Sequence, residues 1–93
     1  MSQQKIARRH IVRGRVQGVG FRYFAQHSAD AIGIRGYVRN LDNGDVEVYA
    51  IGSNEQLSDL AGMLWKGPRY ADIRGVEVQE AAVEQCSGFH IRH

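Results

Sequence analysis

Glycine and arginine are concentrated in residues 14–22, which read Gly-Arg-Val-Gln-Gly-Val-Gly-Phe-Arg. Glycine can adopt positive φ angles and lets the main chain come close to a ligand. A helix that begins at the end of this segment presents unpaired N–H groups and the positive end of its dipole, and both favour an anion. The fork-shaped guanidinium of Arg22 also suits phosphate. The segment therefore predicts an anion-binding loop, although a strand-to-helix turn that is merely rich in glycine and arginine has the same composition.

In this loop we expect main-chain N–H groups and the Arg22 side chain to bind a phosphoryl group. The residues expected to contact it are Gln17, Gly18, Val19, Gly20, Phe21 and Arg22. Two nucleotide-binding loops also use glycine, but neither fits this segment. The Walker A loop needs Gly-Lys-Ser/Thr where this chain has Gly20-Phe21-Arg22, and the dinucleotide fingerprint needs a third glycine where this chain has Tyr23.

The spacing of apolar residues predicts the elements that position the loop. Residues 8–16 alternate as a strand does and lead into the loop. Apolar residues then recur at helical spacing over residues 21–32, and Gly33 is a typical helix C-terminal stop. Residues 34–41 are rich in β-forming residues, and Asn43-Gly44 predicts a tight turn into the next strand of a hairpin.

The second half of the chain repeats this order. Ser53 and Gln56 have the spacing of a capping box, and the helix that they begin ends at Gly67-Pro68. Residues 72–80 read as a strand, and residues 89–91 mark a short last strand. The order β-α-β-β-α-β predicts an α+β fold of the ferredoxin-like split βαβ type, an antiparallel sheet with two helices on one face and a short extra C-terminal strand. We expect a single domain over residues 1–93.

This topology brings a second polar residue close to the loop. The first two strands of a βαβ unit run parallel and end at one edge of the sheet, with one strand between them and about 10 Å between their ends. The first strand leads into the glycine-rich loop, and the second ends at Asn40. We therefore expect Arg22 and Asn40 to hold a phosphoryl group and a water molecule between them. Taken alone, Asn40 is more typical of a residue that only begins a hairpin turn.

These segments resemble the acylphosphatase family. The resemblance rests on residues 14–22, on Gly36-Tyr37-Val38-Arg39-Asn40, on Gly67-Pro68 and on Gly88-Phe89, and it covers residues 8–92. It implies a ferredoxin-like fold and hydrolysis of the mixed anhydride between a carboxylate and phosphate, with Arg22 binding phosphate and Asn40 holding the attacking water. Because a carboxylate is a good leaving group, we expect no metal, no cofactor and no covalent intermediate, and catalysis by positioning and electrostatics.

Charge limits the partners of the chain. The net charge is only +2, but residues 1–40 hold eight basic residues against one acid, and residues 41–93 hold four against nine. A basic first half favours an anionic partner, either a phosphorylated small molecule or nucleic acid. RNA-recognition domains share the predicted topology, and Arg35-Gly36-Tyr37-Val38 is faintly similar to their aromatic motif, but the first strand lacks an exposed aromatic residue. We expect a small acyl phosphate as substrate, inorganic phosphate or sulfate as a site ligand, and no nucleic acid.

Composition adds expectations about location and assembly. Cys86 is the only cysteine and cannot form an internal disulfide, and no apolar segment is long enough to cross a bilayer, so we expect a cytoplasmic protein with no membrane partner. The four histidines show no metal-ligand spacing. Small size and mixed charge favour a monomer.

Two questions stay open at this point. Acylphosphatase-like modules also occur inside larger proteins such as the hydrogenase-maturation carbamoyltransferase, so a catalytically quiet domain is an alternative to the independent enzyme that this short chain favours. The resemblance also leaves acetyl phosphate, 1,3-bisphosphoglycerate and carbamoyl phosphate as substrates of equal standing.

Overall fold

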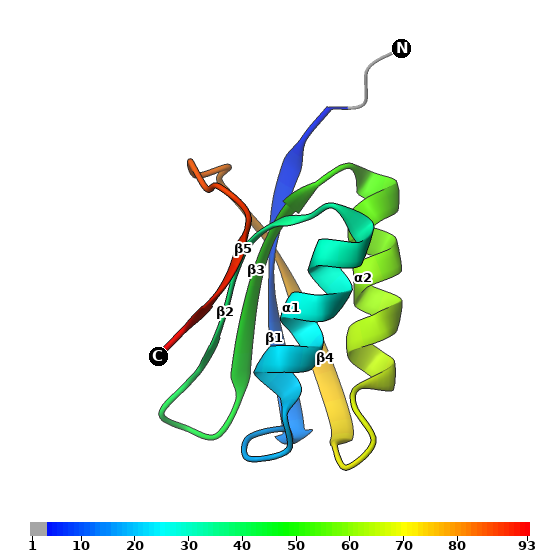
Figure 1. Ribbon diagram of the computed structural model, residues 1–93, viewed down its shortest axis with the longest axis vertical. Helices are drawn as coiled ribbons and strands as arrows, with labels where there is room; N and C mark the ends of the chain where they lie inside the picture. Colours follow the sequence, from blue (N-terminus) through cyan, green and yellow to red (C-terminus); the bar gives the residue numbers. More distant parts are fainter. Residues whose placement is uncertain (1–3) are drawn as a thin grey trace.

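The computed structural model of the protein describes residues 4–93. Its elements, in chain order, are β1 (Ile6–Arg15), α1 (Phe21–Ile32), β2 (Arg35–Asn40), β3 (Val46–Gly52), α2 (Asn54–Lys66), β4 (Asp72–Ala81) and β5 (Phe89–Arg92). The strands form one sheet in the order β4-β1-β3-β2-β5, and both helices cover the same face of it (Figure 1). The predicted α+β, ferredoxin-like fold is confirmed. One detail differs, because β5 pairs with β2 in parallel and makes the sheet mixed.

The main core lies between the sheet and the two helices. Its buried side chains alternate along the strands and recur at helical spacing in α1 and α2, as binary patterning requires. They include Val12, Val38, Val48, Ala25, Ala29, Leu57, Leu60 and Leu64. The predicted capping box begins α2: the Gln56 main-chain N–H donates to the Ser53 hydroxyl at 3.1 Å, and the Gln56 side chain accepts from the Ser53 N–H at 2.9 Å.

The opposite face of the sheet carries a second, smaller core built on two stacked tyrosines. The rings of Tyr37 and Tyr49 lie 5.2 Å apart and are only 6% and 0% exposed. The guanidinium of Arg92 lies 3.8 Å from the centre of the Tyr37 ring, and the Tyr49 hydroxyl accepts a hydrogen bond from the Glu84 main-chain N–H at 2.8 Å. Because both rings are covered, these two tyrosines do not offer the open stacking surface with which RNA-recognition domains bind bases.

A buried carboxylate on this face fixes the end of β2. The Glu47 side chain is 8% exposed and accepts from the Nε atoms of Arg9 at 3.0 Å and of Arg39 at 2.6 Å. Its hydrogen bond and charge raise the pKa of Arg39 above the ordinary value. A buried charge needs such partners, and this one has two. Since Arg39 directly precedes Asn40, the pair also restricts the strand end on which Asn40 lies.

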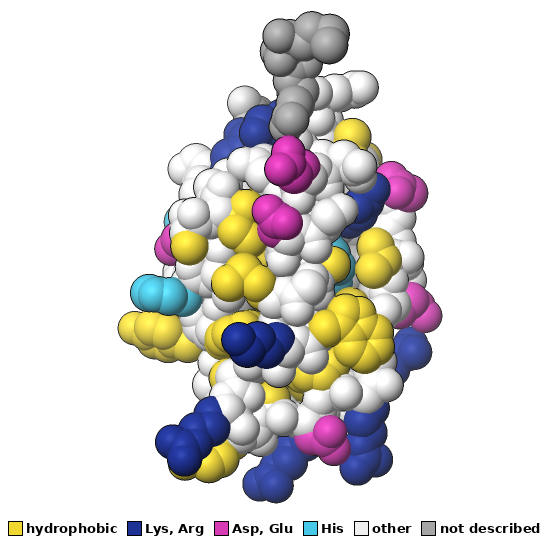
Figure 2. Space-filling view, turned by 90° about the vertical axis from the view of Figure 1, so that its right-hand side faces the viewer, with side chains coloured by type: hydrophobic (Ala, Val, Ile, Leu, Met, Phe, Trp, Pro, Cys, Tyr) yellow, Lys and Arg dark blue, Asp and Glu magenta, His cyan; other side chains and the backbone are white. Residues whose placement is uncertain are grey.

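Cationic side chains gather at one end of the molecule. Figure 2 shows Lys and Arg side chains around the lower end of the face that carries α2, where Figure 1 places the loops between β1 and α1 and between α2 and β4. The sign of this end suits an anionic ligand. Separately, none of the helices formed by residues 4–93 combines the length and the hydropathy of a membrane span.

Candidate active site

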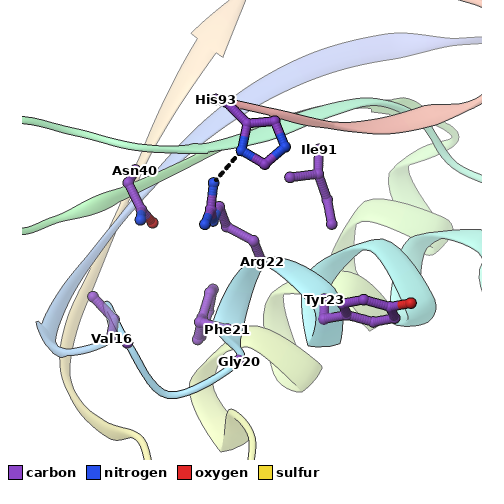
Figure 3. Close-up of a pocket in the computed structure, with 9 residues that line it drawn as sticks. Val16, Gly20, Phe21, Arg22, Tyr23, Asn40, Ile91 and His93 are labelled. Carbon is purple, nitrogen blue, oxygen red and sulfur yellow. Dashed lines mark hydrogen bonds between the residues drawn. The ribbon is translucent and has the colours of Figure 1, made fainter.

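A cavity of about 340 Å³ opens at the end of the sheet where β2 ends and α1 begins (Figure 3). Its walls come from the β1–α1 loop, the first turn of α1, and the ends of β2 and β5. The lining residues are Val16, Gly18, Gly20, Phe21, Arg22, Tyr23, Asn40, Ile91 and His93. The cavity therefore collects four of the six predicted phosphate-binding residues together with Asn40.

The glycine-rich loop makes the floor of this cavity. Gly18 and Gly20 have φ angles of 74° and 79°, in the left-handed region that glycine adopts without strain. A Cβ atom at either position would meet no other atom within 4 Å, so the backbone conformation requires glycine there while packing does not. The space that a side chain would occupy is left open to a ligand.

Gly20 is also the N-cap of α1, and no side chain caps this helix end. The first intrahelical bond comes from the Phe24 N–H, which donates to the Gly20 carbonyl at 3.0 Å. The N–H groups of Phe21, Arg22 and Tyr23 precede it and have no partner within the helix. With the positive end of the helix dipole, they make the mouth of the loop a favourable place for an anion.

Arg22 and Asn40 reach the cavity from different elements, as the topology predicted. Arg22 lies in the first turn of α1 and Asn40 is the last residue of β2, with β3 between β1 and β2 in the sheet. In Figure 3 both side chains point into the space above the loop. The Asn40 side-chain amide makes no hydrogen bond within residues 4–93, and there Arg22 is bonded through its side chain only to His93, with 3.2 Å between Arg22 Nη1 and His93 Nδ1.

The electrostatics of the cavity are one-sided. None of the described residues that line it is an aspartate or a glutamate, and Arg22 forms no ion pair in the described part of the chain. The guanidinium charge is therefore not neutralised by a carboxylate of the protein. A dianionic phosphoryl group that enters the cavity meets this charge and the dipole of α1 together.

Gln17 and Val19 do not line the cavity, in contrast to the other predicted loop residues. The Gln17 side-chain amide turns toward the β2–β3 hairpin and donates to the carbonyl oxygens of Leu41 at 2.8 Å and Asp45 at 2.9 Å. Val19 packs against the main core. Both side chains thus hold the loop in place, and contact between their main-chain N–H groups and a phosphoryl group stays a prediction.

Three lining residues were not predicted from the sequence: Tyr23, Ile91 and His93. The signal for Tyr23 was available, because it directly follows Arg22 in the first turn of the helix. Ile91 and His93 depend on the pairing of β5 with β2, which sets Arg39 beside Arg92 and brings the residues that follow to the cavity. A short strand at the end of the chain does not reveal that pairing in its own sequence.

Comparisons with known proteins agree with this geometry. The family model described as Acylphosphatase matches residues 8–91. The chain belongs to the acylphosphatase family. A curated acylphosphatase from Solibacter usitatus (strain Ellin6076) is 60% identical over 86 residues, which cover 92% of this chain and 90% of that relative.

Solved structures extend the comparison to the fold of this acylphosphatase. The crystal structure of the Bacillus subtilis acylphosphatase matches with a TM-score of 0.92 and 37% identity, covering 95% of this chain and 99% of that one. A structure of full-length HypF matches with a TM-score of 0.89, but at 24% identity and over 12% of the larger chain, so it shows a shared fold alone. The relatives of similar length thus confirm the predicted family of enzymes.

Proposed function

We propose that this acylphosphatase hydrolyses small acyl phosphates to a carboxylate and inorganic phosphate in the cavity above the glycine-rich loop. The observation that carries this proposal is the convergence, in one carboxylate-free cavity, of a helix N-terminus, the Arg22 guanidinium and the unpartnered Asn40 amide. Each of these groups suits one part of a phosphoryl transfer reaction, and together they need no further component.

The loop and Arg22 bind the phosphoryl group. Main-chain N–H groups of residues 17–22 donate to its oxygens, and the guanidinium supplies two parallel donors and a fixed charge. In the transition state charge is redistributed over these oxygens, and donors that are already oriented stabilise it without reorganisation. The site residues therefore act by electrostatics and positioning.

Asn40 orients the attacking water. Its amide is both donor and acceptor, so it can bind a water molecule and direct a lone pair toward phosphorus, in line with the departing carboxylate. The proton of that water passes to a phosphoryl oxygen of the substrate. His93 is not free to accept it at Nδ1, because this atom already accepts from Arg22. No serine, threonine or cysteine is among the described lining residues, so we propose direct attack by water without a covalent intermediate.

Phosphate release from acetyl phosphate, measured with EDTA present, tests this assignment. Losing one oriented donor to a developing charge typically lowers the rate by about 10²–10³-fold. Arg22→Ala should therefore lower kcat and raise KM, Arg22→Lys should recover only part of the loss because the fork is missing, and Asn40→Ala should lower kcat more than it raises KM.

Two exposed residues far from the cavity provide matched controls. Arg74→Ala, on β4, and Asn54→Ala, at the start of α2, should leave both constants unchanged. Inorganic phosphate and sulfate should inhibit competitively. Near-normal turnover by either alanine variant of the site, or a requirement for added Mg²⁺, would contradict the proposed roles.

We further propose that the protein acts in the cytoplasm as a monomeric single domain over residues 1–93, with no nucleic acid or membrane partner. The single, unpaired Cys86 is in keeping with a reducing compartment. The covered tyrosines of the open sheet face argue against base stacking. Light scattering coupled to size-exclusion chromatography, with and without RNA, tests the monomer and the absence of binding in one experiment.

A further inference from the structure

His93 contributes an acceptor to the cavity. Its Nδ1 atom lies 3.2 Å from Arg22 Nη1. A guanidinium has only donors, so the imidazole must be the acceptor in this pair, with Nδ1 unprotonated. Figure 3 shows the ring directed at Arg22, from the side of the cavity opposite the loop. The contact therefore exists only while the imidazole is neutral.

The position of His93 is set by a well-anchored strand. Phe89, the first residue of β5, is 3% exposed in the main core, and its carbonyl accepts from the Gln26 side chain of α1 at 3.2 Å. The strand then runs parallel to β2, with Arg92 beside Arg39. The same two elements that carry Arg22 and Asn40 thus hold the strand that leads to His93.

The chemistry of this acceptor matters because Arg22 has no acidic partner among the described residues. A carboxylate in the place of His93 would orient the guanidinium but would also cancel its charge and repel a phosphoryl dianion. A neutral imidazole orients the same group and leaves its charge intact. The cavity thereby combines a fixed arginine with a fully positive one.

We propose that His93 is a positioning residue, whose neutral imidazole holds the Arg22 guanidinium over the loop for the phosphoryl group. This inference rests on the proposed function of Arg22. Protonation of the ring removes the acceptor and sets two cations side by side. The other groups around the ring do not offset this, because Tyr23 of α1 and Asn40 of β2 are neutral, and the guanidinium of Arg92 on β5 lies against the Tyr37 ring.

Steady-state hydrolysis of acetyl phosphate by four variants tests the proposal. One net hydrogen bond corresponds to a change of about 3- to 10-fold, so His93→Ala should lower kcat/KM by that factor. His93→Asn keeps a neutral acceptor close to the position of Nδ1 and should recover most of the loss. His90→Ala is the matched control, since His90 is an exposed histidine of the same strand that does not line the cavity. It should behave as the wild type.

The fourth variant, Arg22→Ala with His93→Ala, separates positioning from an independent role. If His93 acts through Arg22, the double variant should be no slower than Arg22→Ala alone. The pH profile gives a further readout, because imidazole ordinarily titrates near pH 6.5. Wild-type kcat/KM should fall toward that of His93→Ala below about pH 6.5, whereas His93→Ala and His93→Asn should show no such step.

Wild-type kcat/KM in His93→Ala, no recovery in His93→Asn, or additive losses in the double variant would each overturn the positioning role. An active Arg22→Ala enzyme would instead refute the proposed function of the site. The two failures are therefore distinguishable, since the positioning role can fail while Arg22→Ala remains inactive.

Discussion

Replacement of Gln17 by leucine should weaken both the fold and the catalysis of this acylphosphatase. The Gln17 amide joins the phosphate loop to the hairpin that follows Asn40, through hydrogen bonds of 2.8 and 2.9 Å to the carbonyls of Leu41 and Asp45. Leucine has a similar size and cannot make either bond. Both carbonyls keep one main-chain donor, since Leu41 O accepts from the Gly44 N–H and Asp45 O from the Leu41 N–H.

These remaining donors set the magnitude of the expected effect. No acceptor is left unsatisfied, so the loss is that of two net hydrogen bonds in a half-buried place, about 1–2 kcal/mol in the free energy of unfolding. For a domain of this size that corresponds to a fall in Tm of at least about 4 °C. The hairpin also becomes free to move relative to the loop, and small displacements of a positioned group are costly to the rate. We expect kcat to fall by about 10-fold with a smaller change in KM.

Urea unfolding and acetyl phosphate hydrolysis measure the two effects on the same samples. Gln85→Leu is the control, because Gln85 is exposed and its side chain makes no hydrogen bond within residues 4–93. A double variant with Asn40→Ala tests the link between the effects. If Gln17 acts through Asn40, adding Gln17→Leu should lower kcat no further. An unfolding midpoint and a kcat equal to those of the control would refute the reasoning.

Two further predictions concern stability alone. Gly14→Ala should destabilise by about 1–3 kcal/mol in urea unfolding, because a Cβ would lie 2.0 Å from the Asp72 carbonyl oxygen at a φ of 125°, whereas Gly62→Ala, in open space on α2, should stabilise by about 0.5–1 kcal/mol; equal effects would contradict the close approach. His10 is fully buried, its Nε2 has no partner within residues 4–93, and burial lowers its pKa. The unfolded chain therefore binds a proton near pH 6.5 that the native state does not, so the free energy of unfolding should fall below that pH by up to about 1.4 kcal/mol per pH unit. The His10→Leu variant should lose this part of the slope, and an unchanged slope would show that His10 is protonated in the native state.

Much of this molecule could be predicted from the sequence because its local signals agree with one another. The capping box at Ser53, the Asn43-Gly44 turn and the change from strand to helix periodicity at the loop all predict the same topology, and that topology brought Asn40 to Arg22. What the sequence did not reveal depends on long-range pairing. The direction of the Gln17 side chain and the place of His93 follow from contacts with segments 24 and 71 residues away. Neither leaves a local pattern.

The positions of the functional groups also follow from a property of regular secondary structure. Inside a strand or a helix the main-chain donors are used by the ladder or by the next turn, and strand side chains point to faces that are largely covered. Free groups occur where elements end. In this fold the start of α1 and the ends of β2 and β5 lie at the same end of the sheet, and each provides one group: the unpaired amides above Gly20, the Asn40 amide and the His93 imidazole. The sheet can therefore hold a phosphoryl group without giving up any of its own hydrogen bonds, and a change that lengthens β2 or β5 beyond these ends should damage activity before it damages stability.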